Sequence, residues 1–140
     1  MQRFLYLLII LFLGACATVT QPKVYRETSY PSISYETAFN YVIRAGDDIG
    51  FEPARYPRPN KEKGIVTLMA KAETGERVVK ALIFTPLWRH FVLEVRINRE
   101  GNIARGVHLK VTQITGATIK REEMEKLAKT YLEALGKYWK

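Results

Sequence analysis

Cysteine, histidine and serine are scarce in this chain of 140 residues. The single cysteine, Cys16, excludes an intrachain disulfide. Neither of the two histidines, His90 and His108, belongs to an HExxH motif, and the chain has no second cysteine to complete a Cys–His ligand set. The sequence therefore predicts no metal site. The serines all fall within residues 29–34, which leaves the rest of the chain without a serine nucleophile. A glycine-rich phosphate loop is also lacking, and we therefore expect neither an enzyme nor a bound cofactor.

Long apolar runs are lacking as well, apart from one near the start. Residues 4–13 are ten uncharged, mostly apolar residues that follow Arg3. A helix needs roughly 20 such residues to span a bilayer, so this run is too short and fits the core of a signal peptide. The alternatives are a plain secretory signal, or a buried strand followed by a chance cysteine.

The run closes with Leu13-Gly14-Ala15-Cys16, which resembles the bacterial lipobox at all four positions. The resemblance implies removal of residues 1–15, a diacylglycerol on the Cys16 thiol and a fatty acid such as palmitate on the new N-terminus. One acyl chain binds a bilayer only marginally, whereas several together form a stable anchor. In the lipoproteins that this segment resembles, Asp after the cysteine favours the inner membrane. Ala17 therefore implies an outer-membrane anchor facing the periplasm.

Acidic residues are the minority among the charged ones. The chain has 22 basic and 14 acidic residues, and removal of Arg3 with the signal peptide leaves a net charge of 21 − 14 = +7. A basic envelope protein suits an anionic partner such as a lipid headgroup, an acidic protein surface or an envelope polymer. The alternative is that the charge only serves solubility. Export makes nucleic acid an unsuitable partner.

The mature chain is long enough for one domain. Residues 16–33 are polar, contain two prolines and show no periodicity, so we expect the lipidated cysteine and a flexible tether there. Residues 34–140 are then a single domain. A helix is predicted at 35–49, with Ser34 as its N-cap and Gly50 after its end.

Strands are predicted at 51–56, 65–72, 77–84, 90–98 and 105–114, where apolar and polar residues alternate or β-formers cluster. Short connections predict antiparallel neighbours, and a hairpin at 99–102 would bring His90 and His108 near each other. A second helix is predicted at 120–138, with Thr118 as N-cap. We expect an α+β fold: an antiparallel sheet of four to five strands with the N-terminal and C-terminal helices packed on one face.

The order helix, Gly50-Phe51, loop, then Gly64-Ile65-Val66-Thr67-Leu68 and a terminal helix is similar to the helix-grip domain of BamC-like envelope lipoproteins. This resemblance implies an accessory role in envelope assembly without catalysis. The larger members carry two such domains, and this chain has room for one.

Two loops combine aromatic and basic residues. Tyr56 and Arg58 lie in one, between Arg55 and Pro59, and Trp88 and Arg89 lie in the other. Trp and Arg are favoured at interface hot spots, and proline-stiffened loops lose less entropy on binding. These four residues are the predicted partner-binding candidates. Trp88 has an alternative role as a plug that packs under its own loop.

The sequence favours two alternative functions. The first is a lipid-anchored accessory that binds an envelope protein or an anionic envelope polymer. The second is a periplasmic carrier with an apolar cavity between sheet and helix, lined by residues such as Phe91, Leu93, Val107 and Leu127.

Overall fold

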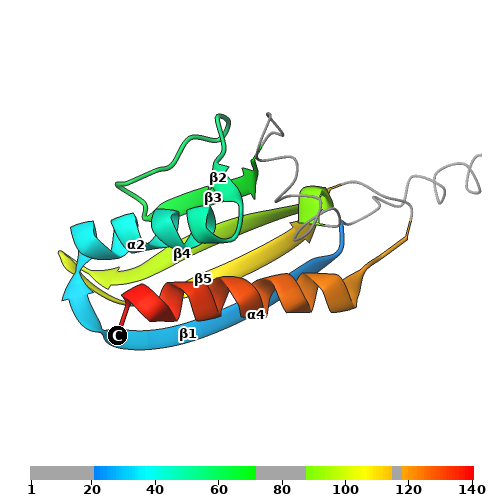
Figure 1. Ribbon diagram of the computed structural model, residues 1–140. Coiled ribbons are helices and arrows are strands. Elements are labelled where there is room, and N and C mark those ends of the chain that lie inside the picture. Colours follow the sequence, from blue (N-terminus) through cyan, green and yellow to red (C-terminus); the bar gives the residue numbers. More distant parts are fainter. Residues whose placement is uncertain (1–20, 72–87, 115–117) are drawn as a thin grey trace, which may run out of the picture.

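The computed structural model describes residues 21–71, 88–114 and 118–140. These residues form one five-stranded antiparallel sheet, in the order β1-β5-β4-β3-β2, and two helices (Figure 1). The elements are β1 Lys23–Ser34, α2 Tyr35–Asp48, β2 Phe51–Pro53, β3 Ile65–Ala70, the 3₁₀ turn η1 Trp88–His90, β4 Phe91–Glu100, β5 Ile103–Gln113 and α4 Arg121–Tyr138. The predicted α+β class is confirmed. The strand predicted at 77–84 lies outside the described residues.

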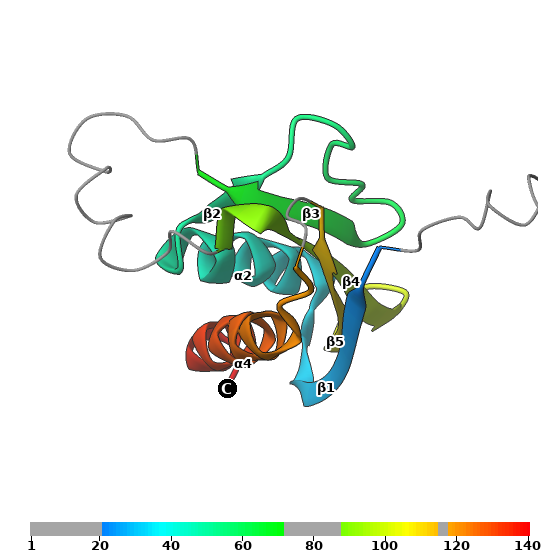
Figure 2. The ribbon, with the colours of Figure 1, turned by 90° about the vertical axis from the view of Figure 1, so that its right-hand side faces the viewer.

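Both helices cover the same face of the sheet (Figure 2). The apolar residues of β4 and β5 alternate toward that face, as their sequence periodicity predicts. On α4 the buried residues recur at three- and four-residue spacing, which is the pattern of a helix packed on one side. The core contains side chains from both helices and all five strands, among them Val24, Val42, Phe51, Val66, Leu93, Leu109 and Leu127.

Helix α2 begins and ends where the sequence predicts. The Ser34 hydroxyl oxygen accepts a hydrogen bond from the backbone N–H of Thr37 at 3.3 Å, which satisfies one of the free donors at the helix start. Glu36 lies in the first turn, where negative charge suits the helix dipole. Gly50 follows with φ +85°, a backbone conformation that residues with a Cβ rarely adopt.

Strands β4 and β5 form the predicted hairpin, which turns at Gly101 with φ +58°. Its register contradicts the expected approach of the two histidines. His108 lies opposite Arg96, whereas the backbone of His90 bonds to Ile114 at the other end of the hairpin. The histidines are therefore six strand positions apart, which is about 20 Å.

The predicted tether is wrong from Lys23 onward, because residues 23–34 are strand β1. This strand pairs with β5 from Lys23 opposite Thr112 to Ser34 opposite Ile103, so the domain begins before residue 34. It is the edge of the sheet, and only Val24 is fully buried along it. An edge strand exposes most of its side chains and tolerates proline, here Pro31, so it lacks the apolar alternation that identifies a strand.

Helix α4 begins at Arg121, after Lys120 as the cap residue, and Thr118 is not its N-cap. The side chain of Gln113 organises this helix start instead. Its amide nitrogen donates to the Thr118 carbonyl at 2.8 Å, and its amide oxygen accepts from the Lys120 N–H at 2.9 Å. Gln113 is buried, and both polar atoms of its side chain form hydrogen bonds. These bonds stabilise the fold, whereas a buried amide without partners would destabilise it.

Two aromatic residues, Tyr131 in α4 and Trp139 directly after it, fix this helix to the rest of the fold. The Tyr131 hydroxyl donates to the Val42 carbonyl at 2.9 Å, which joins α4 to α2 inside the core. Burial, with a smaller contribution from Tyr30, raises the pKa of the Tyr131 phenol well above 10.0, so it stays protonated. Trp139 stacks on Tyr30, and its indole N–H donates to the Pro31 carbonyl at 2.6 Å. These contacts hold α4 against β1.

Candidate functional site

The predicted lipidation residue, Cys16, lies outside the described residues. The structure describes the four predicted partner-binding residues, and it places them in two different settings. Trp88 is half-buried, and Arg89 beside it is exposed. Tyr56 and Arg58 are both exposed.

Trp88 packs against the core. It is the first residue of η1, and its ring centroid lies 6.5 Å from that of Phe51, a fully buried residue of β2. This packing against the core agrees better with the alternative role of Trp88, as a plug, than with a role as an exposed anchor, while the loop residues before it lie outside the described residues. A large part of its apolar surface already has an intramolecular partner.

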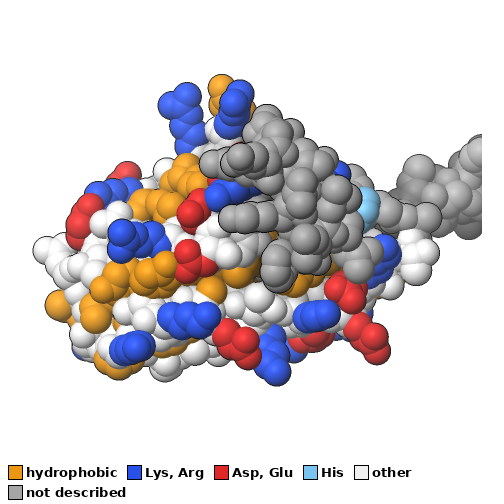
Figure 3. All heavy atoms as spheres, in the orientation of Figure 1, with side chains coloured by type: hydrophobic (Ala, Val, Ile, Leu, Met, Phe, Trp, Pro, Cys, Tyr) orange, Lys and Arg blue, Asp and Glu red, His pale blue; other side chains and the backbone are white. Residues whose placement is uncertain are grey.

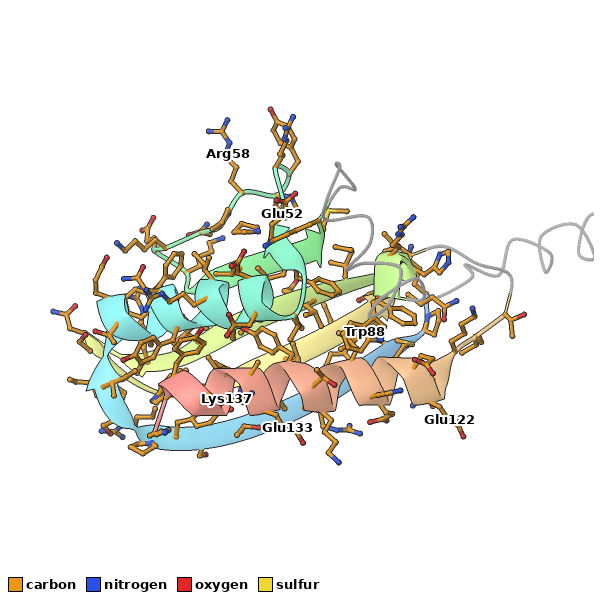
Figure 4. All side chains as sticks on the ribbon, in the orientation of Figure 1. Glu52, Arg58, Trp88, Glu122, Glu133 and Lys137 are labelled. Atoms are coloured by element: carbon orange, nitrogen blue, oxygen red, sulfur yellow. The ribbon has the colours of Figure 1, made fainter. Side chains whose placement is uncertain are left out.

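Tyr56 and Arg58, the other two candidates, lie in the segment of residues 54–64, between β2 and β3. Tyr56 is 81% exposed, the highest value among the exposed large hydrophobic side chains described. Arg55 and Arg58 flank it and are exposed too. The side chain of Arg58 projects away from the sheet and both helices (Figure 4). An aromatic ring between two guanidinium groups in this position is free to meet a partner.

The base of this segment is held firmly. Asn60 and Ile65 exchange two backbone hydrogen bonds of 2.8 and 3.0 Å. The Tyr35 hydroxyl donates to the Lys61 carbonyl, and the Lys61 ammonium pairs with Glu36 at 2.6 Å. Residues 55–59 therefore project from a fixed base, which lowers the entropy lost on binding.

A cation–π contact adds to this base. The Arg99 guanidinium lies 4.0 Å from the centre of the Tyr35 ring and donates to the Glu62 carbonyl. Gly64 closes the segment with φ +69°. A Cβ at this glycine would lie 3.3 Å from the Tyr35 hydroxyl oxygen, so the glycine also makes room for the tyrosine.

The two predicted loops do not form one site. Arg58 and Trp88 lie well apart in the molecule (Figure 4). Trp88 lies in η1, just before β4, whereas Arg58 projects beyond β2. We therefore take residues 55–59 as the candidate partner-binding site.

The residues expected to line a carrier cavity lie in a continuous core. Phe91, Leu93, Val107 and Leu127 are each at most 1% exposed and belong to one cluster of packed side chains. The buried hydroxyl of Tyr131 already has its partner in Val42. Nothing in the described core favours a ligand between sheet and helix.

The described residues line shallow grooves at two places on the surface. One lies between β1 and α4, where Arg26 pairs with Glu125 across it. The other lies on the sheet face that no described helix covers (Figure 2), beside the ion pair Lys110–Glu94 at 3.1 Å and a contact of 3.3 Å between the His108 Nε2 and a Glu27 carboxylate oxygen. Both grooves carry basic and acidic side chains.

The outer side of α4 also carries both signs of charge. Basic and acidic side chains alternate along the lower part of the molecule, where this helix lies (Figure 3). Tyr138 at its end donates to Asp48 at 2.5 Å, and this bond raises the pKa of its phenol. A membrane-surface helix is usually basic on its polar side, so the amphipathic pattern of α4 is explained by core packing.

Within the described ranges, no three His, Cys, Asp or Glu side chains gather as metal ligands would. Neither of the two described helices is long and apolar enough to cross a bilayer. The residues that sequence reasoning missed are structural: Gln113, Tyr30 and Trp139. The one available signal was a tryptophan directly after an amphipathic helix, since large aromatic residues near an apolar face are usually buried.

No protein-family model and no curated protein matches the chain. The resemblances to the lipobox and to BamC-like domains therefore stay predictions.

Proposed function

We propose that the protein is an outer-membrane lipoprotein that binds another component of the cell envelope and has no catalytic activity of its own. A lipid on Cys16 holds it beside the bilayer, facing the periplasm. The partner is an envelope protein or an anionic envelope polymer, and it binds residues 55–59. The observation that carries the binding role is the exposed ring of Tyr56 between two arginines on a fixed base.

The anchor and the folded body are compatible in the chain. Strand β1 begins at Lys23, seven residues after Cys16. The thiol is the only one in the sequence, so it is the one candidate for acylation. The apolar run before it supplies the export signal.

The binding role follows from the chemistry of the projecting segment. Residues 54–64 contain four basic side chains, at 55, 58, 61 and 63, and one acidic side chain, Glu62. Lys61 is paired with Glu36, so the tip carries the positive charge of Arg55 and Arg58. Aromatic rings with neighbouring arginines are typical of interface hot spots, and their charge selects an anionic surface.

The anchor is tested by growth with labelled palmitate. We expect the label on the native chain and none on Cys16→Ser, because no other thiol is present to accept a diacylglycerol. The Cys16→Ser chain should also keep its signal peptide and leave the outer-membrane fraction. Gel mobility, autoradiography and density-gradient fractionation measure the three effects.

Ala17→Asp is the matched control for location. This variant should keep the palmitate label but move to the inner-membrane fraction, because it changes the sorting position and leaves the lipobox intact. If Cys16→Ser is still cut and fractionates like the native chain, the anchor is disproved.

The binding site is tested by photo-cross-linking in intact cells, followed by mass spectrometry, and by co-sedimentation with purified peptidoglycan. The double variant Tyr56→Ala, Arg58→Glu should weaken recovery of the partner by about 30-fold, which corresponds to one hot spot of about 2 kcal/mol. The fold should be unchanged, because both side chains are exposed.

Tyr25→Ala with Arg105→Glu is the matched control, since it changes the same residue types at other exposed positions. This control should leave recovery unchanged. Equal recovery from both double variants would remove residues 55–59 as the binding site. Peptidoglycan binding without a cross-linked protein would identify the polymer as the partner.

A further inference from the structure

At one end of the domain, the residues that lead into β1, the end of β5 and the start of α4 lie together. The Pro22 carbonyl accepts from the Gln113 N–H at 3.2 Å, and the Gln113 side chain holds Thr118 and Lys120. The Ile114 N–H donates to the His90 carbonyl at 2.7 Å, which adds the start of β4. We call this the chain-entry end, defined by Pro22, Lys23, Ile114, Ile119, Lys120 and Arg121. It lies opposite the β4–β5 hairpin (Figure 1).

The chain-entry end exposes apolar side chains beside basic ones. Ile119 is 65% exposed and Ile114 is 38% exposed. Next to them, Lys23 and Arg121 are exposed and Lys120 is half-buried. Two acidic residues follow at 122 and 123, of which Glu123 is half-buried, so the local charge is positive. Exposed apolar side chains next to basic ones are typical of protein surfaces that bind a bilayer.

The length of the chain before Lys23 restricts where this end can be. Lys23 is seven residues after Cys16, a span of about 25 Å when fully extended. Strand β5 has 11 residues and is therefore about 33 Å long, so the hairpin at its start lies farther from the chain-entry end than this reach. An acylated Cys16 keeps the chain-entry end near the headgroups at all times.

We propose that the chain-entry end is a docking surface for the bilayer that holds the lipid anchor. Ile114 and Ile119 enter the interfacial layer, while Lys23, Lys120 and Arg121 contact anionic phospholipid headgroups. This inference rests on the proposed anchor at Cys16. It fixes the orientation of the domain, with the β4–β5 hairpin pointing away from the membrane.

The test uses the full acylated chain in vesicles of phosphatidylethanolamine and phosphatidylglycerol. Because acylation removes the only native thiol, an introduced cysteine is the single site for a fluorescent probe. Ile119→Cys places the probe in the docking surface. Ile103→Cys is the matched control, since Ile103 is also an exposed isoleucine, at 43%, and lies in the hairpin at the other end.

Nitroxide-labelled headgroups should quench the probe at position 119 strongly and the probe at position 103 little, since quenching requires contact at the bilayer surface. Equal quenching at the two positions, whether strong or absent, would show a domain without a preferred orientation and overturn the proposal. Labelling of the unsubstituted chain would show a free Cys16 thiol, and that result would disprove the anchor itself.

The basic side chains are tested in the Ile119→Cys background. Arg121→Ala should lower the ratio of docked to undocked domain by about fivefold, because a base near an anionic surface contributes on the order of 1 kcal/mol. Arg105→Ala, which removes an exposed arginine at the hairpin end, should have no effect. The effect of Arg121→Ala should vanish in vesicles without phosphatidylglycerol. An equal effect of the two substitutions would contradict the proposed surface.

Discussion

Trp139→Ala should lower the free energy of unfolding by about 3–5 kcal/mol, the range for removing a buried tryptophan ring. Trp139 is only 1% exposed, so the substitution leaves a cavity between α4 and β1. It also removes the stacking on Tyr30, whose ring centre lies 4.9 Å away, and the hydrogen bond to the Pro31 carbonyl. Urea unfolding followed by circular dichroism measures the loss.

Trp139→Phe separates the two contributions. Phenylalanine keeps an aromatic ring against Tyr30 but cannot donate to Pro31, so this variant should lose about 1–3 kcal/mol. Tyr138→Ala serves as the neighbouring comparison and should cost less than Trp139→Ala, because Tyr138 is only half-buried: its ring stacks on Tyr41 and its hydroxyl donates to Asp48. A loss below about 1 kcal/mol for Trp139→Ala would mean that the contact between α4 and β1 contributes little to stability.

Gly106→Ala should lower the free energy of unfolding by about 3 kcal/mol, at the upper end of the cost of overpacking. A Cβ at this position would overlap the Thr28 carbonyl oxygen and lie 3.0 Å from Ser29 Cα, both of which are backbone atoms of β1. Backbone cannot rotate away as a side chain can. The edge strand must therefore separate from β5 near its irregular register between Ser29 and Ile33.

Gly101→Ala is the control for this effect. Gly101 has φ +58° and open space around it, so alanine there meets backbone strain alone, at a cost of about 1 kcal/mol. Hydrogen exchange distinguishes the two variants. Gly106→Ala should lose protection of amides in β1, whereas Gly101→Ala should leave β1 protected. Equal protection of β1 in both would contradict the steric explanation.

The elements that the sequence predicts well are those that bury one regular face. Helices α2 and α4 and strands β4 and β5 each repeat apolar residues at the period of their structure. Strand β1 has no such repeat, because it lies at an edge of the sheet and exposes most of its side chains. Its pairing with β5 depends on residues that lie between 103 − 34 = 69 and 112 − 23 = 89 positions away, which no local pattern reports.

The residue types of the candidate site could be predicted from the sequence, but the burial and contacts of these residues could not. The aromatic and basic residues of both loops stand out in the sequence, yet the sequence does not say that Trp88 packs on Phe51 while Tyr56 stays exposed. The base of the projecting segment uses Tyr35 and Arg99, which lie 26 and 37 residues from their partners Lys61 and Glu62. Such contacts depend on the tertiary fold.

The order of the strands has a consequence for the time at which the domain closes. The first strand of the sheet pairs with the last one, and Trp139 reaches back over 108 residues to Pro31. Contacts between such distant residues form late, because the chain must first lose the entropy of closing a large loop. A chain with this connectivity cannot close its sheet at β1 until nearly all of it has been made. Passage through a narrow secretion channel requires an open chain of this kind.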